Sequence, residues 1–132
     1  MTNMDGYNYL GRGKYCAIYS SDEAFDVAST ANDGEIKRTQ NILEEVANNG
    51  FENIHENMFK IEGRFPSGSH KLKDVLVYTT KKNDLRIYCG FLEINGKRLL
   101  CVEAAIKKQN KADQAQLKRV AKKLGELFDE YG

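Results

Sequence analysis

An Asn95-Gly96 dipeptide separates two runs of residues in which apolar side chains alternate with others. This dipeptide is the best match to a type I′ hairpin turn, because both central residues of that turn take positive φ angles. We therefore predict that residues 85–94 and 97–106 pair as antiparallel strands around a two-residue loop. The resulting register pairs Arg86 with Ala105, Tyr88 with Glu103, Cys89 with Val102, Phe91 with Leu100 and Ile94 with Lys97.

Side chains alternate between the two faces of a strand, so the hairpin has two different faces. One face is apolar and is expected to enter the core; it holds Leu85, Ile87, Cys89 and Phe91 beside Leu100, Val102, Ala104 and Ile106. The other face presents a guanidinium, a phenol and a carboxylate, from Arg86, Tyr88 and Glu103. We interpret this second face as the location of a site.

The 132 residues are enough for one domain with a sizeable core, so we expect a single domain over residues 1–132. The net charge of +1 conceals an asymmetry. Residues 1–69 hold six Lys and Arg against eleven Asp and Glu, a balance of −5, and residues 70–132 hold fourteen against eight, a balance of +6. The basic second half fits a polyanionic partner, and it equally fits a solvated surface.

The three cysteines, Cys16, Cys89 and Cys101, form no CxxC pair and are odd in number. Because no signal peptide is recognisable either, we expect reduced, packed thiols in a cytoplasmic protein. No apolar run approaches the roughly 18 residues that span a membrane. His55 and His70 stand alone in the sequence, so we expect neither a metal nor another cofactor.

The rest of the chain suggests an alternation of short elements. Residues 1–13 are polar and rich in glycine, and we expect them to be mobile. We predict a strand at residues 14–19, a short helix at 22–29, a helix from Asp33 to Asn49, a loop at 64–69, a strand at 75–80 and a helix from about Lys111, capped by Asn110. Short links favour antiparallel pairing, so the predicted class is α+β, with helices packed on one face of a small antiparallel sheet.

The second half of the chain resembles a known family. Residues 86–91 (RIYCGF), Gly96-Lys97, residues 107–111 (KKQNK) and the closing helix are similar to the RelE/HigB-type toxins of toxin–antitoxin modules, especially their phage-related branch. Residues 70–73 (HKLK) resemble the basic stretch before the second strand of that family. The resemblance covers residues 70–125 and implies a RelE-like fold.

The resemblance also implies a function, namely an endoribonuclease that acts on mRNA at the ribosome and is held by a cognate antitoxin. Metal-free RNA cleavage needs a base for the 2′-OH, an acid for the leaving 5′ oxygen and cations for the phosphate. The expected catalytic residues are Arg86, Tyr88, Glu103 and Lys107, with Glu103 as a base or Tyr88 as an acid or base. The expected RNA-binding residues are Lys71, Lys73, Lys108 and Lys111.

Two alternatives stay open. The second strand of the family usually carries Glu-Leu-Arg, whereas residues 75–78 are Val-Leu-Val-Tyr, and the missing arginine fits a loss of catalysis. The chain is then a non-catalytic relative, including a toxin that inhibits DNA gyrase, or a phage-derived module that binds nucleic acid or protein. The sequence leaves the oligomeric state open.

Overall fold

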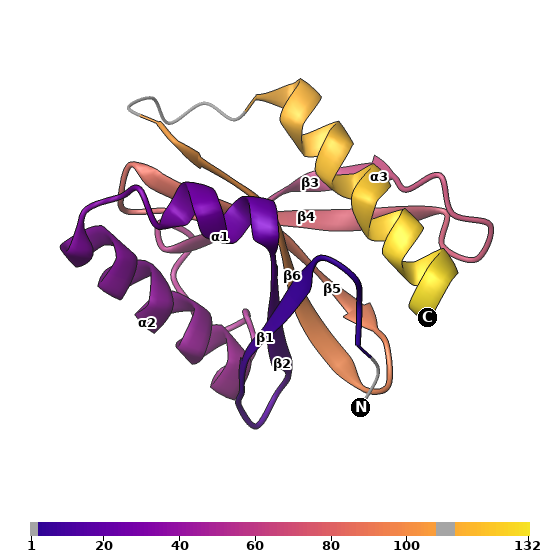
Figure 1. Ribbon diagram of the computed structural model, residues 1–132, viewed down its shortest axis with the longest axis horizontal. Helices are drawn as coiled ribbons and strands as arrows, with labels where there is room; N and C mark the ends of the chain where they lie inside the picture. The colour runs from indigo at the N-terminus through magenta and orange to yellow at the C-terminus, as the bar shows by residue number, and fades with distance from the viewer. Residues whose placement is uncertain (1–2, 108–112) are drawn as a thin grey trace.

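The computed structural model describes residues 3–107 and 113–132 of the chain (Figure 1). Six strands form one sheet in the order β1-β2-β6-β5-β4-β3. In chain order, the elements are β1 (Tyr7–Arg12), β2 (Ala17–Ser21), α1 (Asp22–Ala28), α2 (Asp33–Asn49), β3 (Phe59–Pro66), β4 (Asp74–Thr80), β5 (Leu85–Glu93), β6 (Lys97–Ile106) and α3 (Gln114–Tyr131). The predicted α+β class is confirmed, but the sheet is larger than expected.

The sheet is mixed, not purely antiparallel as predicted. Strand β2 pairs with β6 in parallel, and the other neighbouring strands pair antiparallel. The parallel pair is possible because α1, α2 and three further strands separate β2 from β6 in the chain, which gives the long connection that parallel strands require. The short links that suggested a purely antiparallel sheet hold for β1 to β2 and for β3 to β6.

The hairpin of β5 and β6 forms where it was predicted, with Asn95 and Gly96 at φ angles of 51° and 101°. Its loop has three residues, because the first strand pair is Glu93 with Lys97. A bulge on β6 at Val102 corrects the register, so the predicted pairs Tyr88–Glu103 and Arg86–Ala105 are confirmed. The predicted pairs nearer the turn are wrong by one residue.

This bulge also changes which side chains share a face. Leu100 and Val102 lie with Tyr88 on the face toward α3, whereas Leu99 and Cys101 lie with Ile87 on the other face. The expected single apolar face is therefore wrong for β6. Both faces of the hairpin are buried.

Helices cover both faces of the sheet, in contrast to the predicted single layer (Figure 1). The apolar residues of α1 and α2 pack on one face, and those of α3 pack on the other. The prediction failed because the second face of the hairpin also carries apolar residues, among them Leu92, Leu100 and Val102. These residues must be buried as well, and α3 buries them.

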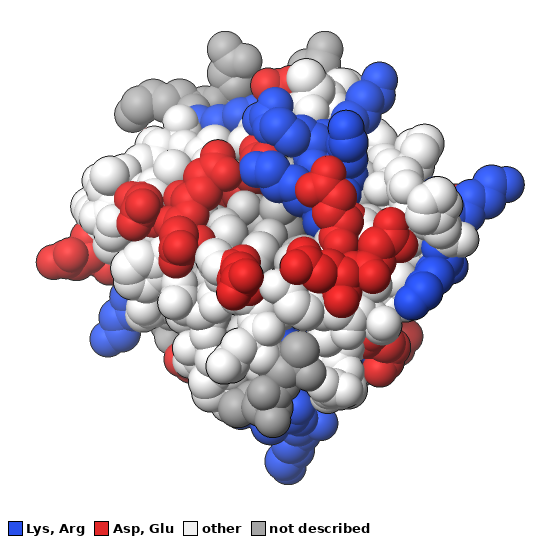
Figure 2. All heavy atoms as spheres, turned by 45° about the vertical axis from the view of Figure 1, so that its right-hand side comes forward, with Lys and Arg blue, Asp and Glu red and all other residues white. Residues whose placement is uncertain are grey.

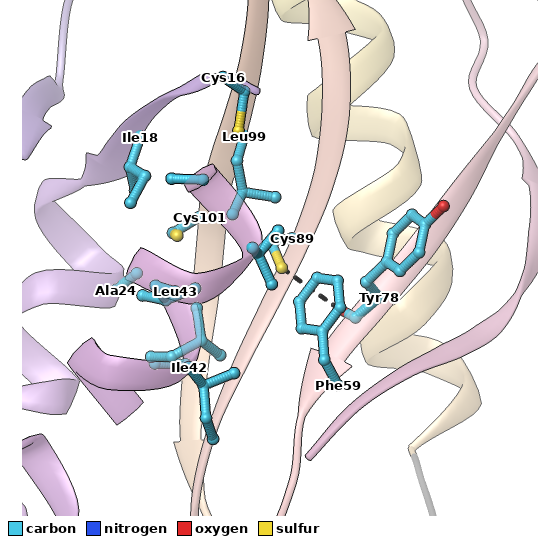
Figure 3. Close-up of a cluster of buried hydrophobic side chains, with 14 of the residues drawn as sticks. Cys16, Ile18, Ala24, Ile42, Leu43, Phe59, Tyr78, Cys89, Leu99 and Cys101 are labelled. Carbon is cyan, nitrogen blue, oxygen red and sulfur yellow. Dashed lines mark hydrogen bonds between the residues drawn. The ribbon is translucent and has the colours of Figure 1, made fainter. Parts of the chain in front are cut away.

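Each helix of the layer formed by α1 and α2 has an N-cap. The Ser21 hydroxyl accepts the N–H of Ala24, and the Asn32 side chain accepts the N–H of Glu35. Figure 3 shows the core beneath this layer, where the Cys89 thiol donates to the carbonyl of Tyr78. All three cysteines are free and buried, and burial raises the pKa of Cys16 to about 11, so this thiol stays protonated at neutral pH.

Helix α3 begins later than predicted, at Gln114, with Asp113 as its N-cap. The predicted cap, Asn110, lies outside the described residues. Two glycines permit α3 to pack closely against β5 and against the loop before β4. A Cβ on Gly90 would lie 2.5 Å from Cδ1 of Leu124, and a Cβ on Gly125 would lie 2.1 Å from the carbonyl oxygen of Ser67.

Two further segments differ from the prediction. Residues 1–13 were expected to be mobile, but Tyr7–Arg12 form the edge strand β1 and Met4 is buried. Residues 64–66 were expected in a loop, but they complete β3. Pro66 is accommodated because it is the last residue of an edge strand, where no partner needs its missing N–H.

Candidate functional site

A row of polar side chains crosses four strands on the face toward α3. The register pairs Lys60 of β3 with Thr79 of β4, Thr79 with Tyr88 of β5, and Tyr88 with Glu103 of β6. Directly paired residues lie on the same face of a sheet. We call these four residues the polar row. It confirms that Tyr88 and Glu103 are brought together, and it adds Lys60, which the sequence analysis did not consider.

An open hollow adjoins one end of this row at the turn between β4 and β5. Its volume is about 550 Å³, and we call it the basic hollow; it is lined by His55, Glu56, Asn57, Lys60, Lys81, Lys82, Asn83, Asp84 and Arg86. Four of these residues are Lys or Arg and two are Asp or Glu, which leaves a balance of +2 with a neutral histidine. No residue of α3 lines the hollow.

Arg86 is held in the hollow by the turn that precedes it. Its side chain is only 6% exposed, and its Nε donates to the carbonyl oxygen of Asn83 at 2.9 Å. The Asn83 side chain is in turn fixed by α2, because its Oδ1 accepts from Nε of Arg38 at 2.7 Å and its Nδ2 donates to Oγ1 of Thr39 at 3.3 Å. Helix α2 therefore positions Arg86 through Asn83.

A carboxylate of α2 makes a second set of contacts to the same turn. Oε1 of Glu35 accepts the N–H of Asp84 at 2.8 Å and that of Leu85 at 3.2 Å. Within this turn Lys82 has a φ of 81°, a left-handed conformation that is uncommon for a residue with a Cβ. Backbone in such conformations is concentrated at functional sites, where the surrounding structure holds it in place.

Glu103, the predicted base, is part of the interface between β6 and α3. It is 2% exposed, and Arg119 binds it with two hydrogen bonds, from Nε to Oε2 at 2.9 Å and from Nη2 to Oε1 at 3.0 Å. Nζ of Lys123 lies 2.9 Å from Oε2, and Gln116 donates to Oε1 at 3.3 Å. The base role stays a prediction, and these contacts count against it.

The pKa of Glu103 follows from the same contacts. Burial by itself raises the pKa, but the hydrogen bonds from Arg119 and Lys123 outweigh burial and hold the pKa below its ordinary value. A carboxylate with a lowered pKa and donors on both oxygens is a weak proton acceptor at neutral pH.

A second carboxylate, Glu62 of β3, lies beside the polar row. Its Oε2 accepts from Oγ1 of Thr79 at 3.1 Å and lies 3.3 Å from Nζ of Lys81. Its side chain is 6% exposed. Because Lys81 also lines the basic hollow, this ion pair connects the carboxylate to the hollow.

Tyr88 lies between these two carboxylates. Burial raises the pKa of its hydroxyl to about 12, and the negative charge of Glu62 adds to the effect. The hydroxyl therefore keeps its proton at neutral pH, which fits a hydrogen-bond donor and not a base. Nζ of Lys107 lies 6.0 Å from the centre of the Tyr88 ring, so this predicted catalytic pair is close in space.

The predicted RNA-binding lysines lie elsewhere or are not described. Lys71 and Lys73 are exposed in the loop before β4, whereas Lys81 follows the other end of this strand. Seven residues of extended chain separate these ends by roughly 23 Å. The structure therefore does not bring Lys71 and Lys73 to the hollow. Lys108 and Lys111 lie outside the described residues.

Sequence reasoning missed most of the hollow. Lys60 lies in residues 53–61, which had no clear assignment, and Glu62 follows directly, although the order Lys60-Ile61-Glu62 has the alternation of a strand. Lys81 and Lys82 lie between the predicted strand at 75–80 and the predicted hairpin, and the sequence analysis gave them no role. His55 stands alone in the sequence, and only the fold brings it beside the lysines and Arg86 of the hollow.

Helix α3 carries bases of its own, of which Arg119 and Lys123 are paired with Glu103. Figure 2 shows Lys and Arg side chains gathered in the upper part of the view, with acidic side chains gathered below them. Along α3 the bases come first and the acids follow toward its end; they are Lys118, Arg119, Lys122 and Lys123, followed by Glu126, Asp129 and Glu130.

No helix in residues 3–107 and 113–132 is long and apolar enough to cross a membrane. Over the same ranges, no three His, Cys, Asp or Glu side chains are grouped as metal ligands would be.

Comparison of the chain with protein-family models, with curated proteins and with solved structures found no match.

Proposed function

We propose that this chain is the toxin of a toxin–antitoxin module and cleaves mRNA in the cytoplasm, in association with the ribosome and without a metal ion. The basic hollow carries the proposal, because it places Arg86 and three lysines around an open space at the end of the polar row. The resemblance of residues 70–125 to RelE/HigB-type toxins supports the choice of RNA. The function rests on both together.

The hollow has the chemistry that a phosphodiester requires. A guanidinium can form two parallel hydrogen bonds to phosphate oxygens, and lysines contribute further positive charge. In the proposed reaction the ribose O2′ attacks phosphorus, the bond from phosphorus to O5′ breaks, and a cyclic phosphate and a 5′-OH result. Arg86, Lys60 and Lys81 stabilise the negative charge that grows on the phosphate oxygens.

The cations of the hollow are better explained by an anionic ligand than by solvation alone. A solvated lysine on a strand end has no need for a fixed position. Here the arginine is nearly buried, the turn before it is bound to α2 at two places, and Lys82 takes an uncommon backbone conformation. Such constraints orient binding groups before the ligand arrives.

A cleavage assay with labelled RNA, with and without translating ribosomes, tests the proposal. We expect the parent protein to cleave, and Arg86→Ala to lower the rate by roughly a hundredfold, the effect of losing one donor to a developing anion. Arg86→Lys should recover only part of the loss, since lysine keeps the charge and loses the fork. Arg64→Ala is the matched control, because Arg64 is an exposed arginine that pairs with Asp74.

Two results would contradict the proposal. One is a parent protein that cleaves no RNA in either assay. The other is an Arg86→Ala variant that cleaves at the parent rate while the control behaves as expected. RNA binding without cleavage would instead favour the non-catalytic alternative, which the occupied carboxylate of Glu103 also favours.

The proposed partner is tested by expression in a suitable host. The protein alone should arrest growth, and co-expression of the protein encoded beside it should restore growth. Normal growth at high levels of the parent protein would count against a toxin.

A further inference from the structure

Two carboxylates flank Tyr88, and their surroundings differ. Glu103 has donors on both oxygens: Arg119 contacts each of them, Lys123 contacts Oε2 and Gln116 contacts Oε1. Both lone-pair regions that could receive a substrate proton are therefore occupied. A general base needs an oxygen that can reach the proton it removes.

Glu62 has one oxygen engaged. Thr79 and Lys81 both contact Oε2, and no described residue forms a hydrogen bond or ion pair with Oε1. The carboxylate is therefore oriented by one oxygen while the other is open to a ligand. No buried side-chain oxygen or nitrogen among the described residues lacks a hydrogen-bond partner, so Oε1 is reached by solvent.

The position of Glu62 relates it to the proposed phosphate site. Lys81 contacts the carboxylate and also lines the hollow, and Lys60 lines the hollow two residues before Glu62 on the same strand. A phosphate held by Lys60, Lys81 and Arg86 therefore lies next to this carboxylate. The ribose on its 3′ side carries the 2′-OH that must lose a proton.

We infer that Glu62 is the general base of the proposed RNA cleavage, and this inference rests on the proposed function. Oε1 of Glu62 takes the proton of the 2′-OH, O2′ forms a bond to phosphorus, and the bond from phosphorus to O5′ breaks. The departing O5′ takes a proton from water, and Glu62 then returns its proton to the hydroxide that remains. Lys81, 3.3 Å from Oε2, keeps the carboxylate oriented.

Single-turnover cleavage measured from about pH 4 to about pH 8 tests the assignment. The parent rate should rise with pH as the base loses its proton. Glu62→Gln should lower the rate by roughly 10²–10⁴-fold and abolish this rise, because the amide keeps the shape and accepts no proton. Glu62→Asp should restore part of the rate and the rise with pH.

The matched control is Glu45→Gln, an exposed carboxylate of α2 on the opposite side of the sheet. It should leave both the rate and its pH dependence unchanged. Affinity for the same RNA with a single 2′-deoxy residue at the scissile position should be the same in Glu62→Gln as in the parent. Denaturant unfolding of each variant checks that the fold is retained.

The results separate this inference from the function on which it rests. If the parent cleaves, Arg86→Ala is impaired, and Glu62→Gln keeps the parent rate or the parent pH dependence, the base assignment is wrong and the function stands. If the Glu62→Gln loss appears entirely as weaker binding of the deoxy substrate, Glu62 is a binding residue and the assignment is again wrong. If the parent cleaves no RNA, both fail.

Discussion

The Glu103 cluster and the basic hollow both gather charged groups around the central strands, yet they differ in how these charges are arranged. In the Glu103 cluster, formed by Glu103, Gln116, Arg119 and Lys123, both oxygens of the buried carboxylate are bound by side chains of α3. In the hollow, the cations surround about 550 Å³ of open space. The difference teaches that a buried charge with its partners in place stabilises the fold, whereas cations arranged around a space are suited to an external anion.

The largest expected effect on stability is at the Glu103 cluster. Glu103→Ala should lower the free energy of unfolding by roughly 2–3 kcal/mol, because the hydrogen bonds of the buried carboxylate to Gln116, Arg119 and Lys123 are lost, while the two bases are exposed enough to turn to solvent. Urea denaturation measures this loss. Lys82→Ala, in the hollow, should change stability by less than about 0.5 kcal/mol. Equal losses at the two positions would remove the distinction between the regions.

Asn83 connects the basic hollow to helix α2, because it contacts both Arg86 and residues of α2. Asn83→Ala removes the side-chain contacts to Arg38 and Thr39, so we expect a loss of roughly 2 kcal/mol in stability. RNA affinity should also fall, since Arg86 bonds to the carbonyl of this residue. Asn48→Ala, at the exposed end of α2, is the control for loss of an asparagine. Full RNA affinity in Asn83→Ala would mean that the turn needs no support from α2.

Acid sharpens the comparison further, because the folded pKa of Glu103 is lowered. A group of this kind stabilises the fold fully above its unfolded pKa, and the contribution is lost as pH falls through the folded pKa. Below the ordinary value of 4.5, the parent should therefore lose stability, by at most about 1.4 kcal/mol per pH unit from this group. Glu103→Gln should lack this component in denaturation measured across the acid range.

The smallest effects are expected in the salt dependence of RNA binding. Lys60→Ala and Lys82→Ala should each reduce the slope of log affinity against log salt by about 0.7, the value for one contact to single-stranded nucleic acid. Lys71→Ala and Lys73→Ala should change the slope less, because they lie at the other end of β4. Fluorescence titration at several salt concentrations measures all four. If the slope changes more for Lys71→Ala and Lys73→Ala than for the other two variants, the RNA binds at Lys71 and Lys73, as the sequence analysis expected.

The sequence predicted the local features whose causes are local. Asn95 and Gly96 set the hairpin, and the apolar period of α2 and α3 set two helices. The bulge at Val102 was not predictable in this way, because it satisfies two packed faces at once, and the existence of the second face depends on where α3 docks.

The candidate site shows the same division. The pairing of Tyr88 with Glu103 follows from register and was predicted. The approach of Lys60 and Glu62 depends on β3 pairing with β4, which no local signal indicated. The chemical role of Glu103 depends on Arg119 and Lys123, which come from a helix that the prediction placed with the others on one side.

The parallel pairing of β2 with β6 has a consequence for how the chain folds. Residues 17–20 find their partners at residues 98–101, so about 80 positions of chain must be present before this part of the sheet can close. Closing so long a loop has an entropic cost, and contacts distant in sequence slow folding. During synthesis β2 therefore lacks this partner until residues 98–101 have been made, and the apolar side of α1, which packs on β6, is exposed until then.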